Sequence, residues 1–406
     1  MVVLTEAADL GASVEQLTEL RSAGMRVAVI AAPGCFIGSA TDPASLNTLA
    51  QRSDITLIAT HQRASRINAL PHVQRIAAHY LNALLDGVFE TPDVLAPMDW
   101  AAHDDVAGHV HTDDGSVGQD PSLRGPSFDP ALTWTCNNGY HSERMEGVIA
   151  ASFFFVESNG SIDANQYSWT QPMIDDVKLQ AIDAWSIWAY SASLHGATVT
   201  AVMDWYEPAG GISVQGYEPI TRSSWEDQLW ISAIMTNLGR TEPGVTGKLH
   251  AFHGERRVAL AADHAFSAFI ACNPPSQGAP SQMADGKIGY AYLGGPYTQI
   301  LYRANGWSTS QVNRVYGHEV GHIFHAFDEY ASSPSSNCSQ LFNGAQNLNY
   351  HGSSCNGPAS CVMVDNSFTG SGATRQWNLC AHTPYHVGWT GVAPAPIATA
   401  PINDSV

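Results

Sequence analysis

The chain has 406 residues, which is long enough for two domains that each bury a core. Its formal net charge of −19 argues against nucleic acid or an anionic membrane as a partner, because both attract basic proteins. No apolar run approaches the roughly 20 residues of a membrane-spanning helix, so we expect no membrane insertion.

The first 86 residues predict a small α/β domain. A capping box of Ser13 and Gln16 begins one helix, and Asp42 before Pro43 is typical of the start of another. The remaining expected elements are strands at 25–32 and 55–59 and a helix at 71–85.

Residues 87–144 predict an acidic linker, because turn-forming residues and aspartates replace the apolar periodicity there. It contains His103, His109 and His111, for which a solvated tract is favoured over a metal site.

Residues 145–392 predict a second domain, in which strands and helices alternate as an α/β sheet requires. We expect strands at 148–157, 198–203 and 265–273, and helices at 169–194 and 222–238. Residues 393–406 form a C-terminal tail.

The most informative motif is His318-Glu319-x-x-His322, the zinc-hydrolase pattern. Residues four apart share one face of a helix, so both histidines can direct a ring nitrogen at one metal ion. Glu319 would reach the open side of that ion and take a proton from a water there. Ser308 or Thr309 can cap this helix.

A zinc hydrolase needs a third protein ligand. His325 faces the same way as His318 but lies roughly 10 Å further along the helix, too far to share an ion. Asp328 stands ten residues after His318, at the place of the third ligand in His-Glu-x-x-His-x-x-Gly-x-x-His. Glu329 is the alternative, because the turn after the helix could slip by one residue.

With Met363 in Cys361-Val362-Met363, this segment resembles the metzincin clan of zinc metallopeptidases, in a version with an aspartate ligand. The resemblance covers roughly residues 145–392 and includes a largely uncharacterised group of bacterial secreted proteins. The further stretches that carry it are Tyr217–Ile220, Tyr290–Pro296, Asp328–Tyr330, Cys380–Thr383 and His386–Trp389.

The resemblance implies a twisted sheet, a zinc helix and a Met-turn with Met363 below the metal. It also implies an antiparallel edge strand at 290–295, to which a peptide substrate could add as a further strand. The candidate substrate-binding residues are Tyr292, Leu293, Gly294 and His325.

Two further expectations follow from the resemblance. His325 stands where the clan has Gly, at a position that often needs a positive φ, which His adopts more readily than most residues. A propeptide-like first domain could block the metal with the thiolate of Cys35, although we favour a buried small hydrophobe there.

Four of the seven cysteines lie in Ser-, Asn- and Gly-rich loops after the metal helix, namely Cys338, Cys355, Cys361 and Cys380. Disulfides are the usual remedy for so small a core in an exported protein. Pairing of Cys338 with Cys355 and of Cys361 with Cys380 is one of three possibilities. We expect a secreted or extracytoplasmic protein, although no signal peptide is visible at the N-terminus.

These expectations combine into a monomeric, zinc-dependent endopeptidase that acts on a peptide or protein substrate. Zn²⁺ would be held by His318, His322 and Asp328, and Glu319 would be the catalytic base. The alternatives are a non-catalytic zinc-stabilised binding module and a zinc hydrolase of a non-peptide amide. Glu319 argues against the first alternative, because a purely structural site needs no base.

Overall fold

The computed structural model has a mixed α/β fold, which confirms the expected class at that level. It describes residues 1–60, 62, 67, 70–86, 142, 144–164, 166–304, 307–331, 333, 336–352, 355, 357, 359–371 and 374–389. The three linker histidines, nearly all of the predicted linker and the predicted tail lie outside these residues. No described helix is both long enough and apolar enough to cross a membrane.

Within the described residues, ten strands form one central sheet in the order β4-β1-β3-β2-β6-β5-β8-β10-β9, with β7 paired to β5. The core from β2 to β10 is parallel, and the pairs at both ends are antiparallel. The strands are β1 Val2–Leu4, β2 Met25–Ala32, β3 Cys35–Ala40, β4 Thr56–Ile58, β5 Gly147–Ser158, β6 Val199–Tyr206, β7 Val214–Gln215, β8 His264–Ala271, β9 Gly289–Ala291 and β10 Tyr297–Leu301.

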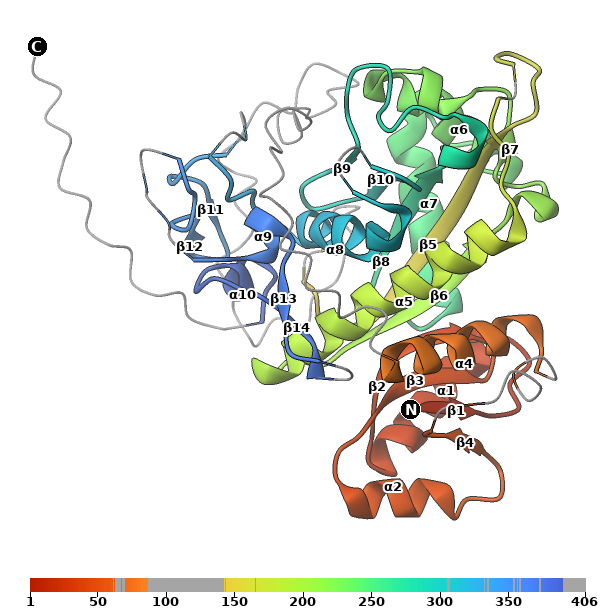
Figure 1. Ribbon diagram of the computed structural model, residues 1–406, viewed down its shortest axis with the longest axis vertical. Helices are drawn as coiled ribbons and strands as arrows, with labels where there is room; N and C mark the ends of the chain where they lie inside the picture. The colour runs from red at the N-terminus through yellow and green to blue at the C-terminus, as the bar shows by residue number, and fades with distance from the viewer. Residues whose placement is uncertain are drawn as a thin grey trace, which may run out of the picture.

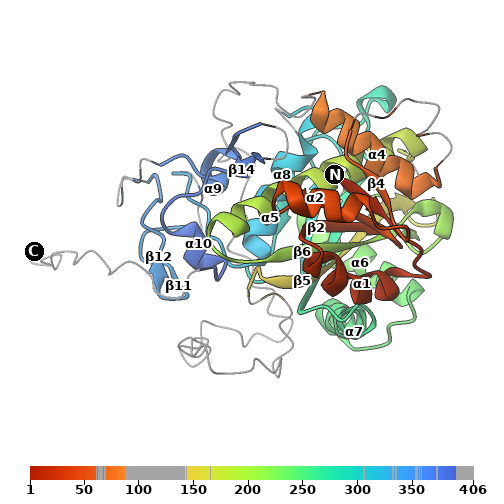
Figure 2. The ribbon, with the colours of Figure 1, turned by 90° about the horizontal axis from the view of Figure 1, so that it is seen from below.

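Helices cover both faces of this sheet, because its central strands are apolar on both sides. One core packs α4, α5 and α8 against the sheet, and two others pack α1, α6 and α7 against the opposite face. Figure 2 shows α4 on one side of β2 and β6, and α1 and α7 on the other. The main helices are α1 Leu10–Ser22, α2 Pro43–Ala50, α4 His72–Leu85, α5 Gln171–Leu194, α6 Asp227–Asn237, α7 Gly244–Ala259 and α8 Val312–Ile323.

The first 86 residues join the rest of the chain through the sheet itself. Strand β2 pairs in parallel with β6, with Val29 opposite Ala201. The Trp205 indole N–H donates to the carbonyl of Ala31 at 3.0 Å, and the Thr200 hydroxyl donates to Val27 at 2.6 Å. This segment (red to orange in Figure 1) therefore extends the sheet next to α5 and β6.

Cys35 lies inside this shared core. It opens strand β3 opposite Leu4 and is fully buried, and its burial raises the pKa of the thiol to about 12. A protonated thiol inside a sheet cannot reach a metal centre as a thiolate. The hypothesis of a blocking Cys35 is therefore wrong, and the favoured interpretation as a buried small hydrophobe is confirmed.

Candidate metal centre

Helix α8 packs against the sheet, and hydrogen bonds from α5 fix its position. A capping box of Ser308 and Gln311 precedes it, and the Ser308 amide donates to Gln311 Oε1 at 3.0 Å. From α5, the Trp185 indole donates to the Tyr316 hydroxyl and the Trp188 indole to the Gly317 carbonyl, each at 3.0 Å. The predicted helix therefore forms, with every residue from Val315 to Ile323 buried, and Ser308 caps the 3-10 turn Thr309–Gln311 that leads into it.

Three donor atoms meet where α8 ends. The Nε2 atoms of His318 and His322 lie 3.0 Å apart, and Asp328 Oδ1 lies 3.2 Å and 3.0 Å from them. A tetrahedral zinc site with bonds of about 2.0–2.2 Å separates its donors by roughly 3.4 Å. The group is fully buried and could hold a metal ion.

Outer hydrogen bonds orient all three donors. The Nδ1–H of His318 donates to the Val362 carbonyl at 2.9 Å, and that of His322 donates to Ala326 at 2.7 Å. Because a carbonyl only accepts, these bonds fix the tautomer that leaves each Nε2 lone pair for a metal. The second oxygen of Asp328 accepts from the Ser333 hydroxyl at 3.2 Å.

His322 and Asp328 each stabilise the charged form of the other. Burial opposes a charge on His322, but the neighbouring Asp328 carboxylate outweighs it and raises the pKa of His322 to about 10. Burial likewise opposes a charge on Asp328, yet the two histidines hold its pKa below the usual range. The site therefore favours a carboxylate facing positive charge, which a cation also provides.

A tight turn brings Asp328 back to the helix. His325 has a φ of 69°, and its amide donates to His322 while the amide of Ala326 donates to Gly321, each at 2.9 Å. This is the Schellman arrangement that usually ends on Gly. His325 thus takes the positive φ that the sequence predicts, and its ring stacks on Phe342 with centroids 3.8 Å apart.

The two consecutive carboxylates after this turn face different partners. Asp328 joins the histidines, whereas Glu329 Oε1 lies 2.9 Å from Cys380 Sγ and 3.2 Å from Thr383 Oγ1. The structure thus brings Asp328, and not the alternative Glu329, to His318 and His322.

Glu319 is the unusual group of the site. Its side chain is fully buried, and neither carboxylate oxygen has a hydrogen-bond partner among the described residues. Burial raises the pKa of Glu319, and the nearby histidines His318 and His322 offset part of that rise. Gly289 of β9 lies beside it, since a Cβ added there would stand 3.4 Å from Glu319 Oε1. A carboxylate without a hydrogen-bond partner among the described residues is placed to exchange a proton beside the donors.

Met363 lies beneath α8, in the short helix α9 Val362–Asp365. A Cβ added to Gly321 would stand 2.6 Å from its sulfur, so only Gly allows this approach. The Met363 carbonyl accepts from the Glu329 amide at 3.0 Å. Met363 therefore contacts both the metal helix and the segment that carries the third donor.

The antiparallel edge strand expected at 290–295 forms only in part, because β9 pairs with β10 but ends at Ala291 and a turn follows. The Gly294 amide that follows it donates to the His322 carbonyl at 2.9 Å, and a side chain at Gly294 would collide with the His325 ring. Leu293 is 39% exposed, and the Tyr292 ring packs on Tyr297 with centroids 4.7 Å apart. The predicted substrate-binding residues thus lie beside the C-terminus of α8.

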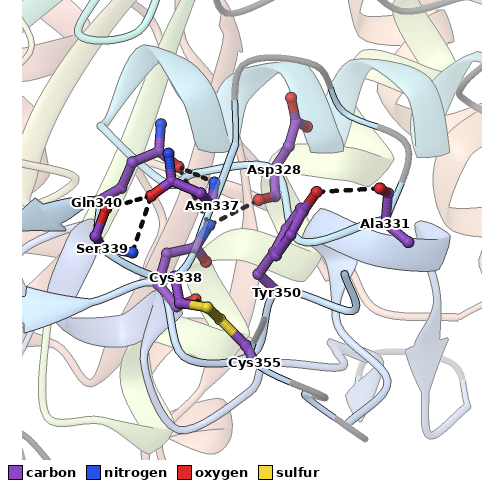
Figure 3. The surroundings of a disulfide bond; sticks show 9 residues. Asp328, Ala331, Asn337, Cys338, Ser339, Gln340, Tyr350 and Cys355 are labelled. Carbon is purple, nitrogen blue, oxygen red and sulfur yellow. Dashed lines mark hydrogen bonds between the residues drawn. A yellow bond between two sulfur atoms is a disulfide. The ribbon is translucent and has the colours of Figure 1, made fainter. Parts of the chain in front are cut away.

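One of the two expected disulfides is present. Cys338 and Cys355 are bonded, and Figure 3 shows this disulfide beside the loop that carries Asp328. Cys361 and Cys380 are free thiols instead, so the second pairing is not formed. Their sulfurs face Glu329 and Thr383.

A buried network around Asp183 of α5 was not predicted. Its carboxylate accepts from two Arg375 guanidinium nitrogens, one of them at 2.9 Å, and from the side-chain amide of Asn313 at 2.8 Å. The Tyr80 hydroxyl, from the first 86 residues, donates to it at 3.4 Å. Asn313 is in the first turn of α8, so the network ties three other segments to the metal helix. An acid among the apolar residues of α5 was the only signal in the sequence.

No protein-family model, curated protein or solved structure matches this chain. The donor set of two imidazoles and a carboxylate suits a borderline divalent ion, and Glu319 lies next to it.

Proposed function

We propose that the chain is a zinc-dependent endopeptidase of the metzincin type. The observation that carries the proposal is the meeting of His318, His322 and Asp328 next to a buried Glu319, which has no hydrogen-bond partner in the part of the chain that the structure describes. A structural site would gain nothing from such a carboxylate, whose burial is unfavourable. A hydrolytic site needs one to move a proton.

Each residue has a role in this proposal. His318, His322 and Asp328 would hold Zn²⁺, which would supply Lewis-acid chemistry by acidifying a water molecule and polarising the peptide carbonyl. Glu319 would accept the proton of that water and return it to the leaving amine. Met363 would support α8 from below without touching the substrate.

Strand β9 would bind the substrate. Its outer edge has no strand beyond it among the described residues, and an extended peptide would pair with the backbone groups there. Tyr292, Leu293, Gly294 and His325 would then line the peptide near the metal. The disulfide between Cys338 and Cys355 supports an extracytoplasmic location, because such bonds persist in oxidising compartments.

The test is digestion of a mixed peptide library by the zinc-loaded full chain. The full chain is used because the first 86 residues share the sheet. We expect cleavage by the wild type, and a loss of about 10²–10⁴-fold in Glu319→Ala with equal zinc content. Glu19→Ala, which removes an exposed glutamate of α1, serves as the matched control.

Three outcomes would contradict the proposal. No cleavage by a folded, zinc-replete wild type would favour a non-catalytic binding module. Cleavage only of non-peptide amides would favour the other hydrolase. Undiminished cleavage by Glu319→Ala would remove Glu319 as the base.

A further inference from the structure

We propose that Glu329, Cys361 and Cys380 form a second, closed metal site, for a thiophilic divalent ion such as Zn²⁺. One ligand atom from each lies within 4.8 Å of the other two, and all three residues are buried. This site is separate from the His318 centre and does not depend on peptidase activity.

The three donors gather around the Thr383 hydroxyl. The Thr383 hydroxyl lies 3.2 Å from Glu329 Oε1, 3.2 Å from Cys361 Sγ and 3.4 Å from Cys380 Sγ. Bonds of about 2.0–2.3 Å in a tetrahedral zinc site place oxygen and sulfur donors roughly 3.5 Å apart. The cluster is about as compact as the histidine centre, where the donors lie 3.0–3.2 Å apart.

The surrounding hydrogen bonds suit metal ligands. The backbone amides of His382 and Thr383 point at Cys380 Sγ at 3.3 Å and 3.4 Å, which favours a thiolate. The side-chain amide of Asn349 donates to Glu329 Oε2 at 2.6 Å, so Oε1 is left to face the two sulfurs. Ligands oriented by outer partners in this way are typical of metal sites.

A bound cation would also neutralise negative charge on this buried carboxyl group and the two sulfurs. Glu329 places a carboxyl group in the protein interior against two sulfurs, and no Lys, Arg or His side chain is bonded to it in any described contact. Binding would release both thiol protons to solvent and balance the resulting anions with the charge of the ion. Soft thiolates beside one carboxylate favour zinc over calcium or magnesium.

The site would join three segments that have little core of their own. Glu329 follows Asp328, Cys361 precedes Met363, and Cys380 and Thr383 stand at the start of the short helix α10 Thr383–His386. A structural ion would therefore fix the position of both the third donor and the residue beneath α8.

A Cys361–Cys380 disulfide is the competing explanation. It would join the same segments, but it gives no role to the buried Glu329 carboxyl. Both sulfurs also contact the Thr383 hydroxyl, and they are thiols while Cys338 and Cys355 are bonded.

Cobalt substitution tests the proposal in the intact chain. We expect a second equivalent of Co²⁺ to give a thiolate-to-cobalt charge-transfer band in the near ultraviolet. The band should persist in His322→Ala, which damages only the histidine centre. It should be absent from the double variant Cys361→Ser with Cys380→Ser, whereas Cys272→Ser, which removes another buried thiol, should retain it.

Metal analysis gives the second measurement. Zinc content should fall from two equivalents in the wild type to one in His322→Ala. One equivalent of zinc in the wild type with no cobalt band would overturn the proposal. So would a peptide map, made without reductant, in which Cys361 and Cys380 are disulfide-linked. Because these readouts use the wild type and His322→Ala, they hold even if the double variant does not fold.

Discussion

The two buried donor clusters take one carboxylate each from the consecutive residues Asp328 and Glu329, yet these carboxylates face different partners. Asp328 faces two histidines on α8, next to the hydrogen-bond-free carboxylate of Glu319. Glu329 faces two thiols and the Thr383 hydroxyl, and its oxygens are fully engaged.

This difference shows what separates a reactive centre from a closed one. The histidine cluster keeps a proton acceptor with no hydrogen-bond partner among the described residues, whereas both Glu329 oxygens in the thiol cluster have such partners. Catalytic sites keep an open position and structural sites fill it. The direction of each side chain after the His325 turn, and not its chemical type, decides which role a carboxylate takes.

Substituting each of the two carboxylates in turn tests this comparison, and it has the largest expected effect. Asp328→Ala should lower kcat/KM on a library-derived peptide by more than the roughly 10–100-fold loss that follows removal of an outer-shell partner. Glu329→Gln should keep kcat/KM within about 10-fold while losing the second metal. Kinetics and zinc content of both variants measure this.

A loss in Glu329→Gln equal to that in Asp328→Ala would contradict the assignment. Glu329 would then act as the third ligand of the histidine centre.

The sequence predicts the metal helix and its turn well, because both depend on local patterns. The spacing of His318 and His322, the cap at Ser308 and the positive φ of His325 need only nearby residues. Strand β2 at Met25–Ala32 and the N-cap at Asp42 are likewise confirmed. Helix α1 is less well predicted, because Asp9 and not Ser13 caps it, with Asp9 Oδ1 accepting from the Ala12 amide at 2.8 Å.

Long-range contacts account for what the sequence does not predict. The pairing of β2 with β6 joins residues about 170 positions apart and follows no local periodicity. The Asp183–Arg375 ion pair spans 192 positions, and the thiol cluster depends on three separate loops. Nothing in the residues before Glu329 indicates that its carboxylate turns away from the histidines.

The Asp183 network sharpens the comparison, because it buries charge that the chain itself neutralises. Asp183→Asn would remove the carboxylate that accepts from two Arg375 guanidinium nitrogens in the protein interior, so the free energy of unfolding should fall by about 3–5 kcal/mol. Urea unfolding of the full chain measures this. Asp175→Asn, on a more exposed part of the same helix, should change it by less than about 0.5 kcal/mol. If the two substitutions lowered the free energy of unfolding equally, the Asp183 network would not contribute to stability.

His386 provides a contrast with the two metal-helix histidines. Burial lowers its pKa from 6.5 to about 3, with His382 and His325 nearby adding to the effect, and its Nε2–H donates to the Ala345 carbonyl at 3.2 Å. Between these values the unfolded chain binds a proton that the folded chain excludes. The contribution of His386 to the free energy of unfolding is therefore complete above pH 6.5. It falls as the pH drops, by at most about 1.4 kcal/mol per pH unit.

Comparing the wild type with His386→Phe isolates this contribution, because loss of metal at low pH affects both proteins. The difference in unfolding free energy should change between roughly pH 7 and pH 4. A difference that is constant with pH would mean that His386 titrates normally.

The smallest expected effect concerns the turn that separates the two clusters. His325→Ala and His325→Gly both remove the ring that stacks on Phe342, so their difference reports the backbone alone. Because φ is 69° there, the Ala variant should be less stable than the Gly variant by about 1–2 kcal/mol. Chemical unfolding measures this difference, and peptide cleavage by the Gly variant then reports the ring. Equal stability of the two variants would mean that the turn relaxes without the ring, and Asp328 and Glu329 could then exchange partners.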